Sequence, residues 1–300
     1  MTAAGNPAFN AAARPLGGGR RLPLSWLGVV PFFVYVGIFL LLPTAIIVAG
    51  ALVAPDGTIS LSNFEGINKP YMFKALTGSL EISAVSSILG AIFGALLAYA
   101  VATGNPKGFL RRSVMSASGV VAQFGGVTLT FAFVATIGTE GFVYLWLLQH
   151  GIDLYPNGVW FFDLPGLTLI YLYFQIPLMV LVFIPALDGI RPQWREATDS
   201  LGGNAWHYWR YVAGPLLFPS FLGCTLLLFA NAFSAYATAN ALLTQGGVIL
   251  PLQVQGLLTS ETGSSSPGLA KALALAMIAV VLVVMSLYAL LQRRTGNWLR

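Results

Sequence analysis

Residues 79–102 read SLEISAVSSILGAIFGALLAYAVA, an apolar run whose one charged side chain is Glu81. As an α-helix, a run of this length crosses the hydrocarbon layer of a bilayer, which takes about 20 apolar residues. The chain has five more such runs, at 26–52, 113–137, 166–187, 211–238 and 268–292. They lack the period-2 alternation of a transmembrane β-strand. The sequence therefore predicts an all-α, polytopic membrane protein with six transmembrane helices.

The composition supports a membrane protein. Of the 300 residues, 57% are hydrophobic and 8% are charged, whereas a soluble domain carries about 25% charged residues. Such a chain cannot cover itself with a water-compatible surface, so the bilayer must act as its solvent. The single cysteine, Cys224, lies inside the fifth run. We therefore expect no intrachain disulfide and no metal site built on cysteine.

Basic residues mark one side of the predicted helices. Of the 15 Lys and Arg residues, only Lys69, Lys74 and Lys271 lie in or beside the opposite loops. The other twelve are Arg14, Arg20, Arg21, Lys107, Arg111, Arg112, Arg191, Arg195, Arg210, Arg293, Arg294 and Arg300. By the positive-inside rule, both termini and the 188–210 loop are expected in the cytoplasm. The net charge of +5 belongs to this rim and does not indicate nucleic-acid binding.

The two ends of the chain differ from the membrane domain, which we expect over 26–292. Residues 1–25 are rich in Ala, Gly, Pro and Arg without an apolar period, which predicts a disordered cytoplasmic tail. A second, short cytoplasmic tail is expected at 293–300. The first apolar run is longer than the about 7–15 apolar residues of a cleavable signal peptide. We therefore expect it to remain as the first transmembrane helix.

The loop between the fourth and fifth runs carries the most specific pattern. It reads RPQWREATDSLGGNAWHYWR over residues 191–210. Residues of one helical face recur at steps of three or four, namely Trp194, Ala197, Leu201, Ala205 and Tyr208. Gly202 and Gly203 interrupt this face, which predicts two short amphipathic helices joined at a glycine bend. Periodicity alone leaves two roles open: lying in the lipid interface, or inserting into a groove of a soluble partner.

The order of residues in this loop resembles the EAA loop of permeases from binding-protein-dependent ABC importers. The family pattern is Glu-Ala-Ala, three residues, Gly, nine residues, then Ile-x-Leu-Pro. This chain keeps Glu196, Ala197, Gly202 and Pro215 at that spacing, and it departs from the pattern at Thr198, Val212 and Gly214. The first and second apolar runs are also similar to those of the family. The segment FANAFSAYATANALLTQG resembles the branch that imports polyamines, phosphonates, thiamine or ferric iron.

The resemblance implies a type I ABC importer permease in the bacterial cytoplasmic (inner) membrane. Such a permease forms half of a translocation pathway for a small, here polyamine-like, solute. The implied partners are an ATPase subunit that uses ATP and Mg, a related second permease chain forming a heterodimer, and an extracytoplasmic substrate-binding protein. In this family the EAA loop is a coupling helix that docks into a cleft of the ATPase. The residues implied in coupling are Glu196, Ala197, Gly202, Gly203, Asn204, Ala205, Trp206 and Tyr208.

Four polar residues in or beside the runs are candidates for the pathway: Glu81, Gln123, Gln175 and Asn231. An ionisable side chain inside a membrane is a functional candidate. Glu81, however, is also expected in the first turn of its helix, where the helix dipole favours a negative charge. The other three either line a path or hold helices together by hydrogen bonds. The sequence leaves these alternatives open.

Other functional classes fit less well. The chain contains no GxxxxGK[ST] motif, so we expect it to use no ATP itself and to need no cofactor. An intramembrane serine protease would need a histidine within a span, whereas His150 and His207 both lie in loops. A secondary transporter not coupled to ATP is the remaining alternative. It would be expected to carry ionisable residues at mid-membrane, and only Glu81 comes near.

Overall fold

A computed structural model describes residues 25–53, 57–105, 108–243, 249–259 and 266–296. Within these residues the chain is helical, and its one β-type contact is an isolated bridge between Val53 and Ile59. Six described segments are long and apolar enough to cross a membrane: Val29–Leu52, Pro70–Ala102, Gly126–Gln149, Leu164–Asp188, Ala205–Ser234 and Pro267–Leu291. The predicted all-α class and six spans are therefore confirmed. The predicted tail at 1–25 lies outside the described residues except for Ser25. Of the predicted tail at 293–300, residues 293–296 instead continue the last helix, Pro267–Gly296, and 297–300 lie outside the described residues.

The chain divides into two compact units, Met1–Ile46 and Ile47–Arg300. The described elements are α1 (Ser25–Val36), η1 (Gly37–Leu41), α2 (Leu42–Leu52), η2 (Ser62–Asn68), α3 (Pro70–Ala102), α4 (Phe109–Gln123), α5 (Gly126–Ile137), α6 (Phe142–Gln149), η3 (Trp160–Phe162), α7 (Leu164–Asp188), α8 (Pro192–Ser200), α9 (Ala205–Tyr208), η4 (Trp209–Ala213), α10 (Gly214–Ser234), α11 (Ala237–Leu242), α12 (Leu250–Thr259) and α13 (Pro267–Gly296). Segments η1 and η4 are π-helical, and η2 and η3 are 3₁₀.

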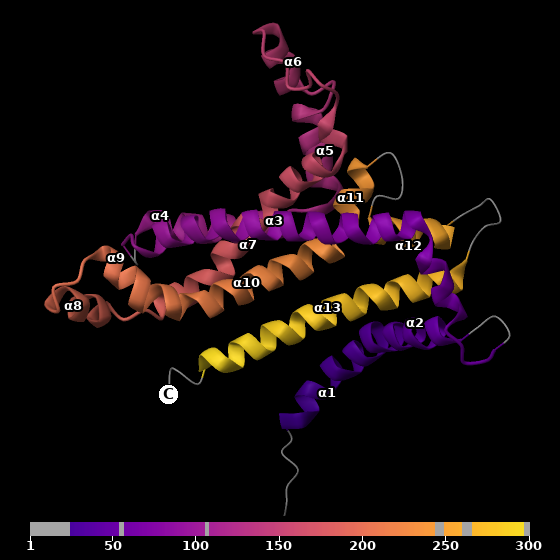
Figure 1. Cartoon of the computed structure of the whole chain (residues 1–300), viewed down its shortest axis with the longest axis horizontal. Helices are drawn as coiled ribbons and strands as arrows, with labels where there is room; N and C mark the ends of the chain where they lie inside the picture. The colour runs from indigo at the N-terminus through magenta and orange to yellow at the C-terminus, as the bar shows by residue number, and fades with distance from the viewer. Residues whose placement is uncertain (1–24, 54–56, 106–107, 244–248, 260–265, 297–300) are drawn as a thin grey trace, which may run out of the picture. The chain divides into compact units, whose positions relative to one another are not determined.

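Helix α3 is the centre of the second unit, where it packs against α7 and α10 (Figure 1). Its contact face carries small residues, so the helix axes approach closely. A Cβ added at Gly94 would lie 2.4 Å from the Cβ of Met179 on α7. Buried serines of α3 bond both within the helix and across to other helices: Ser83 Oγ donates to the Ser79 carbonyl at 2.6 Å, and Ser86 Oγ accepts from Gln175 Nε2 at 2.8 Å. Close packing without orphaned hydroxyls is what a helix buried in a bilayer requires.

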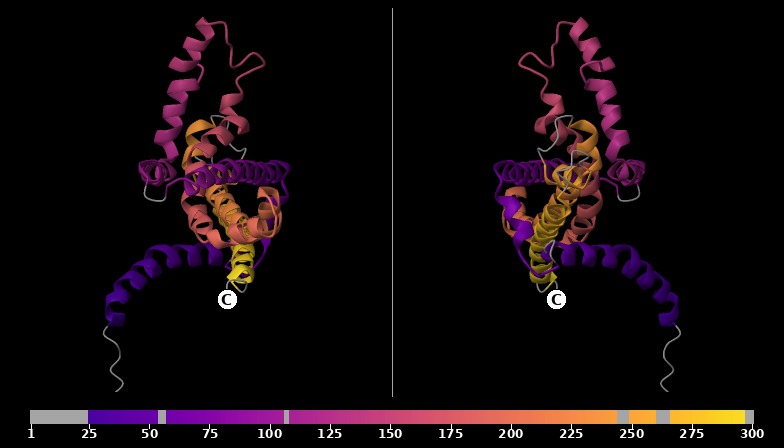
Figure 2. Two further views of the ribbon diagram at one scale, coloured as in Figure 1. Left: turned by 90° about the vertical axis from the view of Figure 1, so that its left-hand side faces the viewer. Right: turned by 90° about the vertical axis from the view of Figure 1, so that its right-hand side faces the viewer.

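The third span differs from the prediction. Residues 113–137 do not form one helix, because the chain breaks at Phe124-Gly125 between α4 and α5. Gly126 has a φ of +73°, a backbone conformation that favours glycine. Hydropathy does not detect this break because the residues on both sides of it are apolar. The apolar span continues instead through α5 and α6, which project away from α3 and α10 in both views (Figures 1 and 2).

The second and fifth spans also begin earlier than predicted. Helix α3 starts at Pro70 rather than near residue 79, since proline is favoured at the first position of a helix, where its missing N–H is not needed. Glu81 therefore lies three turns into α3, is exposed, and is not in the first turn. The prediction that the helix dipole stabilises the negative charge of Glu81 is therefore wrong. The fifth span runs over Ala205–Ser234 and ends before Ala235, not at 238.

The segment between α6 and α7 is held by aromatic side chains. The hydroxyl of Tyr155 donates a hydrogen bond to the carbonyl of Ile137, at the end of α5. Burial raises the pKa of Tyr155, and the neighbouring Tyr144 raises it further. Phe161 is fully buried, and its carbonyl lies so close to Gly166 that a side chain there would clash. These contacts fix the start of α7.

Gly94→Ala tests the central packing. The added methyl group has no room beside Met179, so the free energy of unfolding should fall by about 1–3 kcal/mol. The measurement is thermal unfolding of the purified chain in detergent. Gly119→Ala is the matched control, because a Cβ at Gly119 in α4 meets nothing within 4 Å. Equal stability of the two variants would contradict the close approach of α3 and α7.

Candidate coupling surface and membrane path

The 188–210 loop forms a helix–bend–helix at the junction of α7 and α10. Helices α8 and α9 are separated by the turn at 201–204. Gly202 has a φ of +74°, and its N–H bonds to the Asp199 carbonyl at 3.0 Å. The N–H of Gly203 bonds to the Thr198 carbonyl at 2.9 Å, and a Cβ there would lie 2.6 Å from the Thr198 side chain. The predicted pair of short helices with a glycine bend is confirmed.

The second helix of the loop is continuous with the fifth span. Asn204 caps α9 by accepting the His207 N–H at 3.0 Å, and His207 Nδ1 reaches back to the Asn204 N–H at 3.4 Å. This reciprocal cap is a signal that sequence reasoning missed, since Asn is a preferred N-cap residue. From α9 the helix passes through the π-turn η4 into α10. Because α9, η4 and α10 follow one another without a break, a force on α9 acts directly on the fifth span.

The loop exposes large apolar side chains. Leu201, Trp206 and Tyr211 are 89%, 70% and 72% exposed. Tyr208 is instead buried, with the adjacent Trp209 packed edge-on against Tyr99 of α3 at 5.2 Å. The expected single face through Trp194, Ala197, Leu201, Ala205 and Tyr208 is therefore wrong. The glycine bend redirects α9, so Leu201 and Tyr208 face different surroundings.

The charged residues of α8 line a hollow on the other side of the loop. Arg195, Glu196 and Asp199 line this space of about 320 Å³ together with Tyr208 and the ends of α3 and α7. The family resemblance implies a coupling role for Glu196. Within the described residues its side chain makes no ion pair. Its place in the hollow makes it part of the surface between the loop and the helix bundle.

The ion pair that the described residues do contain lies just before the loop. Arg111 Nη2 is 2.5 Å from Asp188 Oδ2, which joins the start of α4 to the end of α7. In the sequence, Arg111 is one of the basic residues that mark the predicted cytoplasmic side. Seventy-seven positions separate the two partners, so no local pattern could pair them.

The four pathway candidates occupy different environments. Gln175 is fully buried, and its Nε2 donates to Ser86 Oγ at 2.8 Å, so it joins α7 to α3 and does not line a surface. Glu81, Gln123 and Asn231 are exposed. Gln123 is the last residue of α4, and Asn231 lies in the last turn of α10. Both therefore lie beside a helix break.

The two helix breaks are joined to each other. Thr238 of α11 accepts a hydrogen bond from the Gly126 N–H at 3.1 Å, and its carbonyl accepts one from Thr130 Oγ1 at 3.2 Å. These bonds satisfy backbone groups that the breaks would otherwise leave open. Irregular backbone at membrane depth is tolerated where protein or a water-filled cavity surrounds it. The breaks and the polar residues beside them are thus the candidate membrane path.

Solved structures share this fold. A bacterial alginate ABC transporter, solved in complex with an alginate pentasaccharide-bound periplasmic protein, contains a chain that matches with a TM-score of 0.71 and 17% identity. The match covers 90% of this chain and 94% of that one. The fold is therefore that of an ABC transporter membrane subunit.

The family follows from the sequence match. The model of the family described as "Binding-protein-dependent transport system inner membrane component" matches residues 94–297. The chain belongs to this family, and it is a multi-pass permease subunit of a binding-protein-dependent ABC importer. The expected resemblance is confirmed, and nothing in these matches supports a secondary transporter.

Curated relatives match along most of their length. The sulfate transport system permease protein CysW of Synechococcus elongatus is 26% identical over 299 residues, covering 97% of this chain and 98% of that protein. The trehalose transport system permease protein SugB of Mycobacterium tuberculosis is 23% identical, covering 84% of each chain. These relatives are permease subunits, which fits a chain that is not itself an enzyme.

Arg111→Met tests the ion pair at the base of the loop. Because both side chains are partly exposed, the free energy of unfolding should fall by no more than about 1 kcal/mol. Asp188→Asn should lower the free energy of unfolding by the same amount, and the double variant should lower it no further. The loss should shrink at about 1 M salt, where charges are screened within ~3 Å. The readout is thermal unfolding in detergent, with the neighbouring Arg112→Met as control; an equal loss in that control would contradict a specific pair.

Proposed function

We propose that this chain couples ATP hydrolysis in a separate ATPase subunit to the movement of a small solute through a path of which it forms half. The observation that carries the proposal is the mechanical continuity of α9, η4 and α10. The loop meets its partner at one end of this helix, and the candidate path lies at the other end, beside Asn231. ATP and Mg are used by the partner, and this chain needs no cofactor of its own.

The docking surface consists of the exposed apolar residues of the loop. Leu201 and Trp206 lie at and just beyond the glycine bend, where they cover no part of the bundle. Large exposed apolar side chains mark interaction sites, and Trp is enriched among the residues that dominate binding energy. A cleft on the ATPase is the proposed occupant. Gly202 and Gly203 form the bend, and Asn204 and Ala205 begin the helix that carries Trp206.

Glu196 and Ala197 act behind this surface. Glu196 lines the hollow between α8 and the ends of α3 and α7. There it positions the loop against the bundle instead of touching the ATPase.

The second proposed partner is another permease chain. The α5–α6 segment extends from the bundle (Figures 1 and 2) and exposes Phe131, Phe142 and Trp146. In a bilayer, a partner helix or lipid must cover these side chains. We propose a related but different permease, giving a heterodimer whose path lies between the two chains. An extracytoplasmic binding protein delivers the solute.

The path itself is proposed to pass Gln123 and Asn231. These amides are exposed at the two helix breaks, where a polar solute finds hydrogen-bond partners. Glu81 is an exposed carboxylate three turns into α3, and a carboxylate facing lipid would be costly. We propose that it faces the path or the partner permease. Gln175 is omitted because it is fully buried.

The solute is proposed to be small and polar. The resemblance of residues 229–246 favours a polyamine-like solute, whereas the two relatives named above are sulfate and trehalose permeases. One fold thus serves anionic and neutral solutes in related proteins, so the chemistry of the binding protein must decide the class. Stimulation of ATP hydrolysis by each solute class with its binding protein is the direct test.

Trp206→Ala tests the docking surface. Because this indole is exposed and covers no core, the variant should fold normally but retain the ATPase at least about tenfold more weakly. The measurement is co-purification at increasing dilution. Phe73→Ala, an equally exposed aromatic on α3, is the control and should leave retention unchanged. Normal retention by Trp206→Ala would remove the loop from the ATPase contact.

The membrane orientation is tested by cysteine labelling. Because Cys224 lies within a span, the wild-type chain should react little with an impermeant maleimide. Thr139→Cys, which follows α5, should react in intact cells. Leu201→Cys should react only after the membrane is permeabilised. The reverse pattern would place the loop outside, where no ATPase can reach it.

A further inference from the structure

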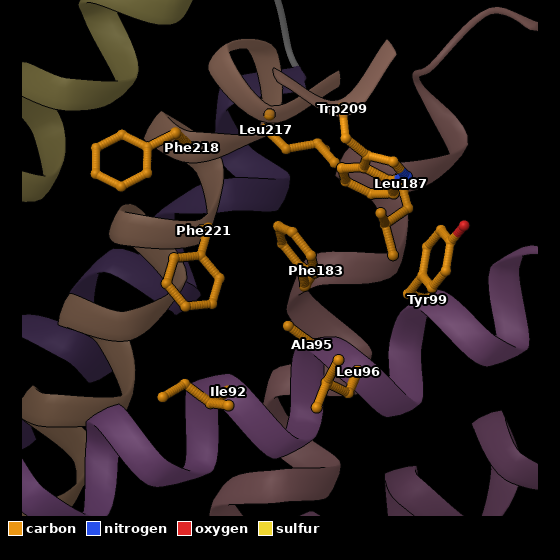
Figure 3. Close-up of a pocket in the computed structure, with 11 residues that line it drawn as sticks. Ile92, Ala95, Leu96, Tyr99, Phe183, Leu187, Trp209, Leu217, Phe218 and Phe221 are labelled. Carbon is orange, nitrogen blue, oxygen red and sulfur yellow. The ribbon is translucent and has the colours of Figure 1, made fainter. Parts of the chain in front are cut away.

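An apolar cavity of about 490 Å³ lies between α3, α7 and α10, beside the coupling loop (Figure 3). Ile92 and Leu96 of α3 line it on one side, and Phe183 of α7 with Phe218 and Phe221 of α10 line it on the other. The side chains at its opening, Leu96 and Phe218, are 61% and 62% exposed. The cavity is therefore open at the surface of the described bundle.

The cavity adjoins the charged hollow under the loop. Tyr99, Leu187 and Trp209 line both spaces, and Figure 3 shows these three side chains grouped at one end of the cavity. Aromatic residues with a polar tip are typical of the level at which hydrocarbon meets headgroups. The two adjoining spaces are thus apolar at one end and charged at the other, and side chains of the type found at the membrane interface lie between them.

Three charged side chains reach the hollow, and no ion pair joins them. Arg195 supplies one positive charge, and Glu196 and Asp199 supply two negative charges. The ion pair found among the described residues is the one between Arg111 and Asp188. A ligand that carries both an anionic and a cationic group would complement this set.

We propose that this space binds one phospholipid of the cytoplasmic leaflet, whose headgroup carries a phosphate and a primary ammonium. One acyl chain fills the cavity, Arg195 binds the phosphate, and Glu196 and Asp199 accept hydrogen bonds from the ammonium. The site rests on the proposed membrane orientation, and it adds a lipid ligand to the proposed transport function.

Other occupants fit less well. A helix about 10 Å in diameter is too wide for a cavity of this volume. A polar solute would lose its hydration against phenyl and alkyl groups without gaining hydrogen bonds. A net anionic headgroup would be repelled by two carboxylates, and a quaternary ammonium has no N–H to donate to them.

The lipid would sit at a mechanically important place. Trp209 begins the π-turn that links the loop to α10, and its ring packs on Tyr99 of α3. An acyl chain beside this contact fills the wedge between the two helices.

The test is native mass spectrometry of the purified full-length chain, with its co-purifying subunits, after delipidation. Phosphatidylethanolamine, phosphatidylcholine and phosphatidylglycerol with identical acyl chains are added at equal concentrations. We expect one retained phosphatidylethanolamine in preference to the others. Arg195→Gln should lower its retention about tenfold, the effect of losing one charge-assisted hydrogen bond. Arg191→Gln, just outside the hollow, should not change it.

A second pair of variants tests the cavity. Leu96→Trp narrows the opening of the cavity at an exposed position, so it should reduce phosphatidylethanolamine retention about tenfold, as Arg195→Gln does. Leu97→Trp, one residue away and outside the cavity, should leave retention unchanged. Equal retention of all three lipids, or unchanged retention by Leu96→Trp or Arg195→Gln, would overturn the proposal. The readout needs no ATP. A wild-type chain that shows no preference for phosphatidylethanolamine but still binds the ATPase and transports counts against the lipid site alone, and retained lipid without ATPase binding counts against the proposed function alone.

Discussion

Every backbone N–H and C=O at membrane depth must find a partner within the protein, and this constraint organises the whole structure. Helix α3 meets it in the simplest way, with continuous intrahelical bonds and serine hydroxyls that donate to carbonyls of their own helix. Glycine and serine on its buried face then let α7 and α10 approach closely. The Gln175–Ser86 bond is the polar contact within this packing. The central bundle thus combines small residues with fully buried hydrogen bonds.

The constraint also explains where the helices are allowed to break. Ending α4 at Gln123 and α10 at Ser234 frees backbone groups in apolar surroundings. The side chain and carbonyl of Thr238 pair with groups of α5, so one residue stabilises both breaks. Such breaks are costly unless they serve a purpose, because an unbroken helix satisfies the same groups without help. The exposed amides of Gln123 and Asn231 beside these breaks support the proposal that the breaks serve a polar route through the membrane domain.

The 188–210 loop is built differently from the central helices, because it lies at the end of the bundle. Its bend leaves Leu201 and Trp206 exposed, while Tyr208 packs inward beside a hollow that charged residues of α8 line. The charged hollow beside the loop adjoins an apolar cavity. The proposed protein and lipid contacts thus lie on different sides of a short helical segment. Both act on the joint between the loop and α10.

The sequence by itself determined the class of protein, the number of spans and the helix–bend–helix of the loop. Hydropathy reports the length and composition of each run, and the glycine pair marks the bend locally. Tertiary structure alone decided that the third run breaks at Phe124-Gly125, that Gln175 is buried and that Tyr208 faces inward. These outcomes depend on partners far along the chain, such as Thr238, which lies 108 positions from Thr130. A pattern read from neighbouring residues describes what a helix is made of, whereas the contacts across the bundle decide where it ends and which face it buries.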